Sequence, residues 1–255
     1  MDLRLDGRRA VVTGGSQGIG LAVARALAAE GAKVALVART ERTLAAAAAR
    51  IPGAVAVSAD TGDDDSVLAM ARQVRERLGG EVDILVNAAA TLSSGRFDES
   101  ELESEINVKV RGYLRTARAF APGMTAAGWG RIINVSGLAA RQSGSLVGSV
   151  RNVAVAALSK NLADELGPQG VNVVVVHPGL TRTEKTPQVL AAMAAARGVE
   201  PADIERTVAE GVSIGRIVTA EEVASVVAFL ASPLSVAING DTIAVGGGAK
   251  GAIHY

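Results

Sequence analysis

The sequence predicts an α/β protein built on a doubly wound parallel sheet of about seven strands, with helices on both faces in three α/β/α layers. Short runs rich in Val and Ile alternate with Ala-rich stretches of helical period along the chain. Hydrophobic residues make up 49% of the composition, and aromatic residues only 2%. A core of small aliphatic side chains suits parallel strands that are buried on both faces.

The expected elements follow one another in a regular order. Strands are predicted at residues 9–13, 32–37, 54–58, 84–87, 131–136, 171–177 and 242–245. Helices are predicted at residues 18–30, 41–50, 63–78, 101–124, 149–166 and 220–230. Because a helix separates most consecutive strands, the strands must run parallel.

The domain organisation is expected to be simple. A chain of 255 residues fits a single domain spanning residues 1–255, and no linker-like stretch divides it. The irregular stretch at about 181–215 carries Pro187, Pro201 and two short helical patterns. Segments that leave the carboxyl ends of parallel strands border the ligand crevice. We therefore expect this stretch to form a mobile lid over the site.

Composition argues against several functional classes. Lys+Arg and Asp+Glu are equal at 26 each, so net charge gives no case for a nucleic acid or an anionic membrane surface as partner. The absence of cysteine excludes disulfides and thiolate chemistry, and with only two histidines no metal site is expected. The first residues do not have the pattern of a signal peptide, and the longest apolar runs are too short to span a bilayer. We expect a cytoplasmic protein.

A glycine-rich segment follows the first predicted strand and opens the first predicted helix. It reads TGGSQGIG at residues 13–20. Gly14 permits a tight turn out of the strand, while Gly18 and Gly20 allow the backbone to approach a pyrophosphate at the helix N-terminus. In this strand–turn–helix context the pattern predicts a Rossmann-type dinucleotide-binding domain.

The chain resembles the short-chain dehydrogenase/reductase family over essentially its whole length. The resemblance is carried by the TGGSQGIG segment, Asp60, DILVN at 83–87, Pro178-Gly179 with Thr183, GR at 215–216, EEVA at 221–224, and the stretches 239–240 and 245–247. It implies a cofactor site formed by Gly14, Ser16, Gln17, Gly18, Ile19, Gly20, Arg39, Thr40, Asp60, Thr61, Asn87, Ala88, Ala89, Pro178, Gly179 and Thr183.

The end of the second predicted strand bears on cofactor choice. An acidic residue there would bind the ribose 2′-hydroxyl and repel a 2′-phosphate. This chain has Arg39 and Thr40 instead, and a guanidinium pairs well with phosphate. We therefore expect NADP, with NAD as the alternative because Gln17 supplies no second cation.

The catalytic pattern departs from the family. Its members use an Asn, a Ser, and a Tyr and Lys spaced as YxxxK, with the Tyr as general acid/base. Ser136 matches the serine at the end of a predicted strand. Aligning AVAALSK at 154–160 with the family's AVAALTK puts Gly148 at the tyrosine and Asn152 at the lysine. Counting forward from Ser136 gives Ser149 instead; we prefer the first register, because helices tolerate slippage less than loops.

A lysine stands where the family has its asparagine. The position of Gly112 and the spacing back from Ser136 both identify Lys109, whereas Asn107 lies two residues away and points to another face of the helix. Lysine and asparagine have thus exchanged places. We expect the candidate catalytic set to be Ser136, Lys109 and Asn152, with the Lys109 amine within hydrogen-bonding reach, directly or through one water, of Ser136 or Asn152.

Other polar residues are expected to be structural. We expect Tyr113 to pack against the sheet, His177 to act as a spacer, Lys160 to be a surface charge, and Tyr255 to reach a site only from a docked tail. The substrate pocket is expected to be lined by the lid together with Ser143, Leu146 and Val147. Arg141, Arg151 and Arg182 suggest an anionic group on the substrate.

Three functions follow from this pattern. The first is an NADP(H)-dependent oxidoreductase acting on a small carbonyl or alcohol substrate, with Lys109 replacing the missing acid. The second is a non-catalytic nucleotide-binding protein, a sensor or scaffold. The third is a non-redox enzyme that uses Lys109 as base or Schiff-base amine. The resemblance also implies a homotetramer or homodimer formed through the two long central helices and the C-terminal strand at 242–245.

Overall fold

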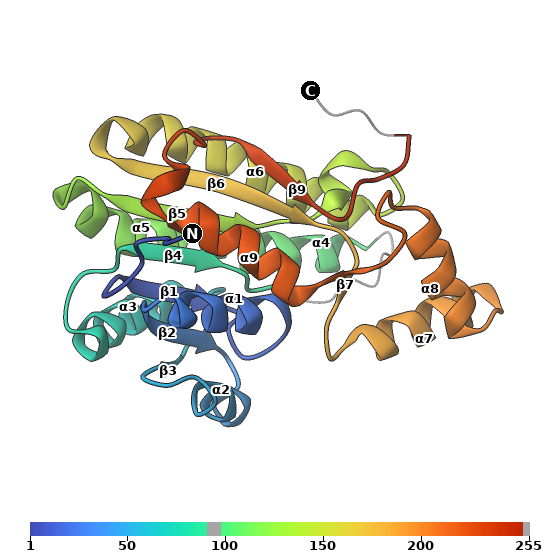
Figure 1. Ribbon diagram of the computed structural model, residues 1–255, viewed down its shortest axis with the longest axis horizontal. Helices are drawn as coiled ribbons and strands as arrows, with labels where there is room; N and C mark the ends of the chain where they lie inside the picture. The colour runs from blue at the N-terminus through green and yellow to red at the C-terminus, as the bar shows by residue number, and fades with distance from the viewer. Residues whose placement is uncertain (91–97, 252–255) are drawn as a thin grey trace.

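The computed structural model describes residues 1–90 and 98–251. Its main sheet has seven strands in the order β3-β2-β1-β4-β5-β6-β9, all parallel (Figure 1). The strands are β1 (Arg9–Thr13), β2 (Lys33–Ala38), β3 (Val55–Ser58), β4 (Ile84–Asn87), β5 (Gly130–Val135), β6 (Val171–Pro178) and β9 (Thr242–Val245). The predicted fold class is confirmed, and the predicted strand bounds agree with the structure to within one residue.

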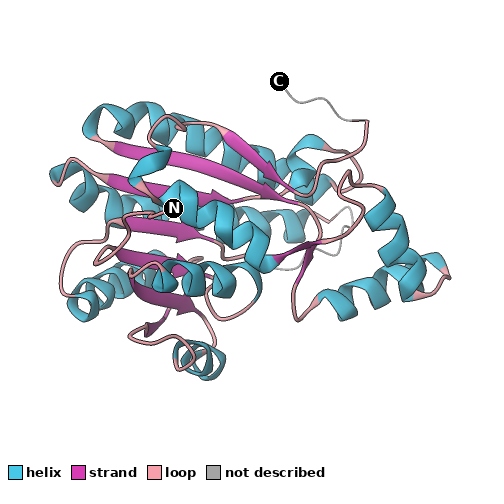
Figure 2. Ribbon diagram, viewed as in Figure 1, coloured by secondary structure: helices cyan, strands magenta, loops and turns pink. Residues whose placement is uncertain are grey.

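Helices cover both faces of this sheet (Figure 2). One face carries α1 (Gly18–Ala29), α2 (Glu41–Ala48) and α9 (Ala220–Ala231). The other carries α3 (Asp64–Leu78), α5 (Gly112–Ala126) and α6 (Leu146–Leu166). Strand side chains alternate between the two layers: Ala10 and Val12 join the first core cluster and Val11 the second.

Two helix starts show how local sequence fixes these elements. The Asp63 carboxylate caps α3 by accepting a hydrogen bond from Ser66 N at 2.7 Å. The helix therefore begins at Asp64, one residue later than predicted. Ser145 caps α6 in the same way, with its hydroxyl accepting from Gly148 N at 3.1 Å. The predicted start of α6 at 149 was therefore wrong by about one turn, because the cap at Ser145 was overlooked.

The expected helix at 101–124 is not one continuous α-helix. The chain forms α4 (Glu99–Glu105), a π-helical segment η1 (Ile106–Arg111) and then α5. A π turn accommodates an extra residue and rotates the side chains that follow it, and such turns occur often at functional sites. Here the π segment contains Lys109 and leaves that side chain buried.

The stretch around 181–215 contains the two short helices that its pattern predicted. They are α7 (Thr186–Arg197) and α8 (Pro201–Glu210), which form a small core of their own from Leu190, Ala194 and Ile204. β7 (Thr181–Arg182) pairs with β8 (Val218–Thr219) at the base of this unit. The unit lies beyond the carboxyl ends of the strands (Figure 1). Among the described residues no helix is long and apolar enough to cross a bilayer.

Candidate functional site

A cleft of about 880 Å³ runs along the carboxyl ends of the central strands. Arg39 and Asp60 line one part of it, and Lys109, Ser136 and Asn152 line another. The unit formed by α7 and α8 contributes to its wall. Strand ends are where a doubly wound sheet places its ligand, because the loops diverge there.

The glycine segment is shaped for a phosphate group. Gly14 and Gly18 have φ angles of +67° and +56°, which side chains with a Cβ rarely adopt. A Cβ on Gly20 would lie 2.3 Å from Gly14 O, so the helix can approach the turn this closely only with glycine there. The start of α1, where helical N–H groups can meet a phosphate, therefore lines the cleft.

Nearly all of the expected cofactor residues line this cleft. The lining includes Gly14, Ser16, Gln17, Gly18, Ile19, Gly20, Arg39, Thr40, Asp60, Thr61, Ala88, Ala89, Pro178, Gly179 and Thr183. Arg39 is exposed and forms no ion pair with any described residue. The Asp60 carboxylate accepts from Gly62 N at 2.8 Å, which fixes its loop.

Asn87 is the exception. It is fully buried below the cleft, where its amide donates to Asn134 Oδ1 at 2.9 Å and its carbonyl oxygen accepts from the Thr116 hydroxyl at 2.8 Å. Asn134 in turn donates to the Ser159 hydroxyl at 2.8 Å. This network joins β4, β5, α5 and α6, so Asn87 supports the floor of the site rather than its surface.

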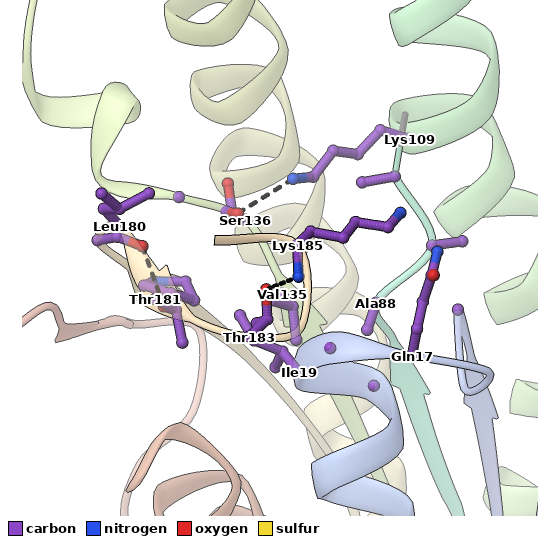
Figure 3. A pocket seen from close by; sticks show the side chains of 18 of the residues that line it. Gln17, Ile19, Ala88, Lys109, Val135, Ser136, Leu180, Thr181, Thr183 and Lys185 are labelled. Carbon is purple, nitrogen blue, oxygen red and sulfur yellow. Dashed lines mark hydrogen bonds between the residues drawn. The ribbon is translucent and has the colours of Figure 1, made fainter. Parts of the chain in front are cut away.

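Lys109 reaches into the floor of the cleft (Figure 3). Its Nζ donates to the main-chain oxygen of Ser136 at 3.0 Å, and the residue is only 3% exposed. The predicted proximity to Ser136 is confirmed, although the acceptor is the carbonyl and not the hydroxyl. Burial lowers the pKa of Lys109 to about 8, because the charged ammonium is removed from water.

Ser136 and Asn152 contact each other beside this amine. The Ser136 hydroxyl donates to Asn152 O or Oδ1, each at 3.2 Å, and Asn152 is buried. Asn107 points elsewhere, as expected: its side chain donates to Gly62 O at 3.1 Å and accepts from Arg115 at 3.0 Å. The structure therefore brings Lys109, Ser136 and Asn152 together without Asn107.

Tyr113 is a structural residue, as expected. Its hydroxyl donates to Val135 O at 2.8 Å and lies 3.2 Å from Ala89 O, and the ring is buried. Burial raises its pKa, because a phenolate there would be desolvated. Tyr255 lies outside the described residues. Lys160 forms a surface ion pair with Asp164, in agreement with the prediction.

His177 is more than a spacer. Its Nδ1 accepts a hydrogen bond from Gly137 N at 3.3 Å, and the ring is 1% exposed. Burial, together with the charges of Arg141 and Lys109, lowers its pKa to about 4. The imidazole is therefore neutral near pH 7. Sequence reasoning missed this contact because it depends on the register of β5 against β6.

The expected lining of the substrate pocket was wrong at three residues. Ser143, Leu146 and Val147 are not among the described lining residues; Leu138, Ala139 and Gln142 stand in their place. The three arginines are each paired within the protein: Arg151 with Glu105, Arg182 with Glu205, and Arg141 with Thr242 at 2.7 Å. Of the three, Arg151 lines the cleft, whereas Arg141 and Arg182 are not among its lining residues.

Sequence reasoning did not single out two residues of the stretch 181–215 that line the cleft. The Glu184 carboxylate accepts from Gly18 N at 2.9 Å and so occupies the N-terminus of α1. Lys185 follows it and extends across the cleft (Figure 3). Their only sequence signal is that they come directly after Thr183. Among the described residues, no group of His, Asp or Glu could hold a metal ion.

Fold and cleft together define a nucleotide-binding protein of the Rossmann type. The family model described as enoyl-(acyl carrier protein) reductase matches residues 14–250. Short-chain reductase protein NovJ of Streptomyces niveus is 36% identical, covering 94% of this chain and 92% of that protein. Galactitol 2-dehydrogenase of Agrobacterium fabrum is 34% identical, covering 96% and 98%.

Solved structures agree with these relatives. L-sorbose reductase of Gluconobacter frateurii, complexed with NADPH and L-sorbose, superimposes with a TM-score of 0.92 at 31% identity, covering 99% of this chain and 100% of that one. The chain therefore belongs to the short-chain dehydrogenase/reductase family, a family of oxidoreductases.

Proposed function

We propose that the protein is an NADP(H)-dependent oxidoreductase that acts on a small carbonyl or alcohol substrate with an atypical proton-transfer group. The observation that carries this proposal is the buried Lys109 amine, 3.0 Å from Ser136 O on the floor of a cleft shaped for a dinucleotide. The glycine segment and the residues around Asp60 would hold the cofactor. When bound, the cofactor supplies or accepts the hydride.

The preference for NADP rests on Arg39. Its guanidinium lines the cleft, and no described carboxylate pairs with it. A free cation at the end of β2 favours the 2′-phosphate of NADP over the 2′-hydroxyl of NAD. The NADPH bound to L-sorbose reductase supports the same choice.

The proposed proton-transfer group consists of residues of this chain. In the preferred alignment Gly148 and Asn152 take the places of the family's tyrosine and lysine, and the sequence of α6 contains no tyrosine. Lys109 with a pKa of about 8 can hold or release a proton near neutral pH. Ser136 orients the substrate oxygen, and its own hydroxyl is held by Asn152.

A second candidate is a nucleotide-binding protein without catalysis. One observation favours it: the hydrogen bond of Lys109 goes to a main-chain carbonyl, a bond that a purely structural lysine would also make. The third candidate, a non-redox enzyme using Lys109 as base or Schiff-base amine, is favoured by the low pKa of that amine.

One set of experiments separates the three. NADPH binding is measured by fluorescence titration, and NADPH oxidation is followed with a panel of aldehydes and ketones, in wild type, Lys109→Met and the surface control Lys160→Met. The proposal expects turnover in wild type and Lys160→Met, and a loss of about 10²-fold or more in Lys109→Met. Tight binding without turnover supports the second candidate, while borohydride trapping of a ketone on Lys109 supports the third.

We also propose how the chain is organised and assembled. Residues 1–255 act as one domain in which the stretch 181–215 closes over the cleft as a lid. Three apolar side chains on α6 are exposed at helical spacing: Leu146 at 43%, Val150 at 44% and Val153 at 50%. A second copy would cover them in a homodimer or homotetramer. We place the protein in the cytoplasm, as expected from its sequence.

A further inference from the structure

The peptide that joins Ser136 to Gly137 is held at both of its polar atoms by side chains from different elements. Lys109 Nζ, from the π segment, donates to its carbonyl oxygen at 3.0 Å. His177 Nδ1, from the end of β6, accepts from its N–H at 3.3 Å. The same peptide carries the side chain of Ser136, whose hydroxyl bonds Asn152. One planar group therefore connects the amine, the imidazole and the serine.

The sheet places the imidazole at this peptide. Ser136 N donates to Val176 O at 2.8 Å, which extends the β5–β6 register by one residue beyond its last paired position. The next N–H, that of Gly137, then meets the side chain of His177 instead of a strand carbonyl. Because Nδ1 accepts, the proton of the neutral ring must be on Nε2.

This peptide, clamped between Lys109 and His177, is also in contact with Asn152; we call the arrangement the clamp. A Cβ built on Gly137 would lie 3.0 Å from Asn152 Nδ2, so the peptide packs directly against that amide. A rotation of the peptide would move the Ser136 hydroxyl and disturb Asn152 at the same time. Losing the imidazole acceptor would also leave the Gly137 N–H without its partner, which favours such a rotation.

We propose that His177 is a positioning residue of the reaction: through the Ser136–Gly137 peptide it fixes both the Ser136 hydroxyl and the Lys109 ammonium. This inference rests on the proposed function for its kinetic part. A hydrogen bond from the N–H polarises the peptide, which makes its carbonyl a stronger acceptor for the ammonium. His177 therefore favours the protonated form of Lys109 without touching substrate or cofactor.

The charged groups around the ring do not oppose this role. Among the described residues, the charges of Arg141 and Lys109 act on it, and both disfavour a second proton on the imidazole. The ring thus stays an acceptor at neutral pH. A histidine that only filled space would be equally buried, but replacing such a histidine would not change the pKa of Lys109.

The first test is the state of the ring. His254 is the only other histidine, so His254→Gln leaves a single imidazole to observe by ¹⁵N NMR. We expect an unprotonated Nδ1 and a protonated Nε2 with no titration between about pH 5.5 and 8. A ring that titrates near about 6.5, or that carries its proton on Nδ1, overturns the proposal.

The second test uses three variants. His177→Asn places an amide oxygen near the position of Nδ1. His177→Gln places its amide oxygen farther from the main chain, and His177→Leu has no hydrogen-bond acceptor. We expect His177→Leu and His177→Gln to lower kcat about tenfold or more, with the Kd for NADPH within about twofold of wild type, and His177→Asn to recover most of the loss. Equal losses of kcat in the His177→Asn, His177→Gln and His177→Leu variants overturn the proposal. If the Leu variant does not fold, the comparison of Gln with Asn decides.

The third test does not require that the enzyme turns over a substrate. The pKa of Lys109, measured from the pH dependence of unfolding, should fall by about one unit in His177→Gln and stay unchanged in His177→Asn. If the wild-type protein reduces no carbonyl, the proposed function fails while this readout still tests the clamp. An unchanged pKa in His177→Gln refutes the clamp, even in an active enzyme.

Discussion

Replacing Lys109 by Met should change how the stability of the protein depends on pH. Burial lowers the pKa of this amine from 10.5 to about 8. At about 1.4 kcal/mol per pKa unit, the charged lysine destabilises the folded state by about 3 kcal/mol relative to the neutral one. The unfavourable term is present in full below pH 8, where the amine is charged in both the folded and the unfolded chain.

The sign of the pH effect follows from proton binding. Between pH 8 and 10.5 the folded chain has released the proton while the unfolded chain retains it, so the stability of the wild type rises with pH. Above that range the amine is neutral in both states and the gain is complete. We therefore expect wild type to gain about 3 kcal/mol relative to Lys109→Met across this interval. The lost hydrogen bond to Ser136 shifts the two curves by a nearly constant amount, so the change in their difference is the quantity to measure.

Urea unfolding at pH 7, 8, 9 and 10.5, without nucleotide, provides the assay. Subtracting the Lys109→Met curve from the wild-type curve removes the titration of all other groups. Lys160→Met is the matched control, because its side chain is 57% exposed and its removal should leave the difference flat. A flat difference for Lys109→Met as well would refute the reasoning, since it would mean that the amine reaches water in solution.

Three further outcomes are expected. Arg39→Ala should weaken NADPH binding about tenfold and leave NADH binding nearly unchanged, measured by fluorescence titration; equal losses for the two cofactors would contradict the 2′-phosphate contact. Glu184→Gln should strengthen NADPH binding severalfold, because the carboxylate that now accepts from Gly18 N competes with the phosphates for the start of α1. An unchanged or weaker affinity would count against that competition. Val150→Glu with Val153→Glu should convert a dimer or tetramer to monomer in light scattering, and a monomeric wild type at micromolar concentration would refute assembly through α6.

Much of the cofactor cleft could be predicted from the sequence, because residues close together in the chain form it. The turn at Gly14, the close approach at Gly20 and the strand before them all lie within one short segment. Asp60 and Thr183, which follow β3 and β7, were assigned through the resemblance to the family, and both line the cleft at the edge where the parallel strands end. Asn87 shows the limit: it ends a strand at that edge, yet its side chain points below the surface into a network with Asn134.

The arrangement of the candidate catalytic residues depended more on tertiary structure than that of the cofactor residues. The sequence predicted that lysine and asparagine are exchanged between positions 109 and 152, but it could not show the π segment in which Lys109 is buried. Nor could it show that the amine contacts the Ser136 carbonyl, because that contact joins residues 27 positions apart on two elements. The role of Glu184 was hidden for the same reason, since its partner Gly18 is 166 positions away.

By itself, then, the sequence determined the order of strands and helices along the chain, the dinucleotide segment and the absence of a tyrosine between Ser136 and Asn152. Periodicity, turn chemistry and residue identity are local properties, and a single chain displays them directly. Only the tertiary structure decided which atoms meet: Lys109 with the Ser136 carbonyl, and His177 with the Gly137 N–H. Those contacts depend on strand register and on one additional residue in a helical turn, and neither leaves a periodic signal in the chain.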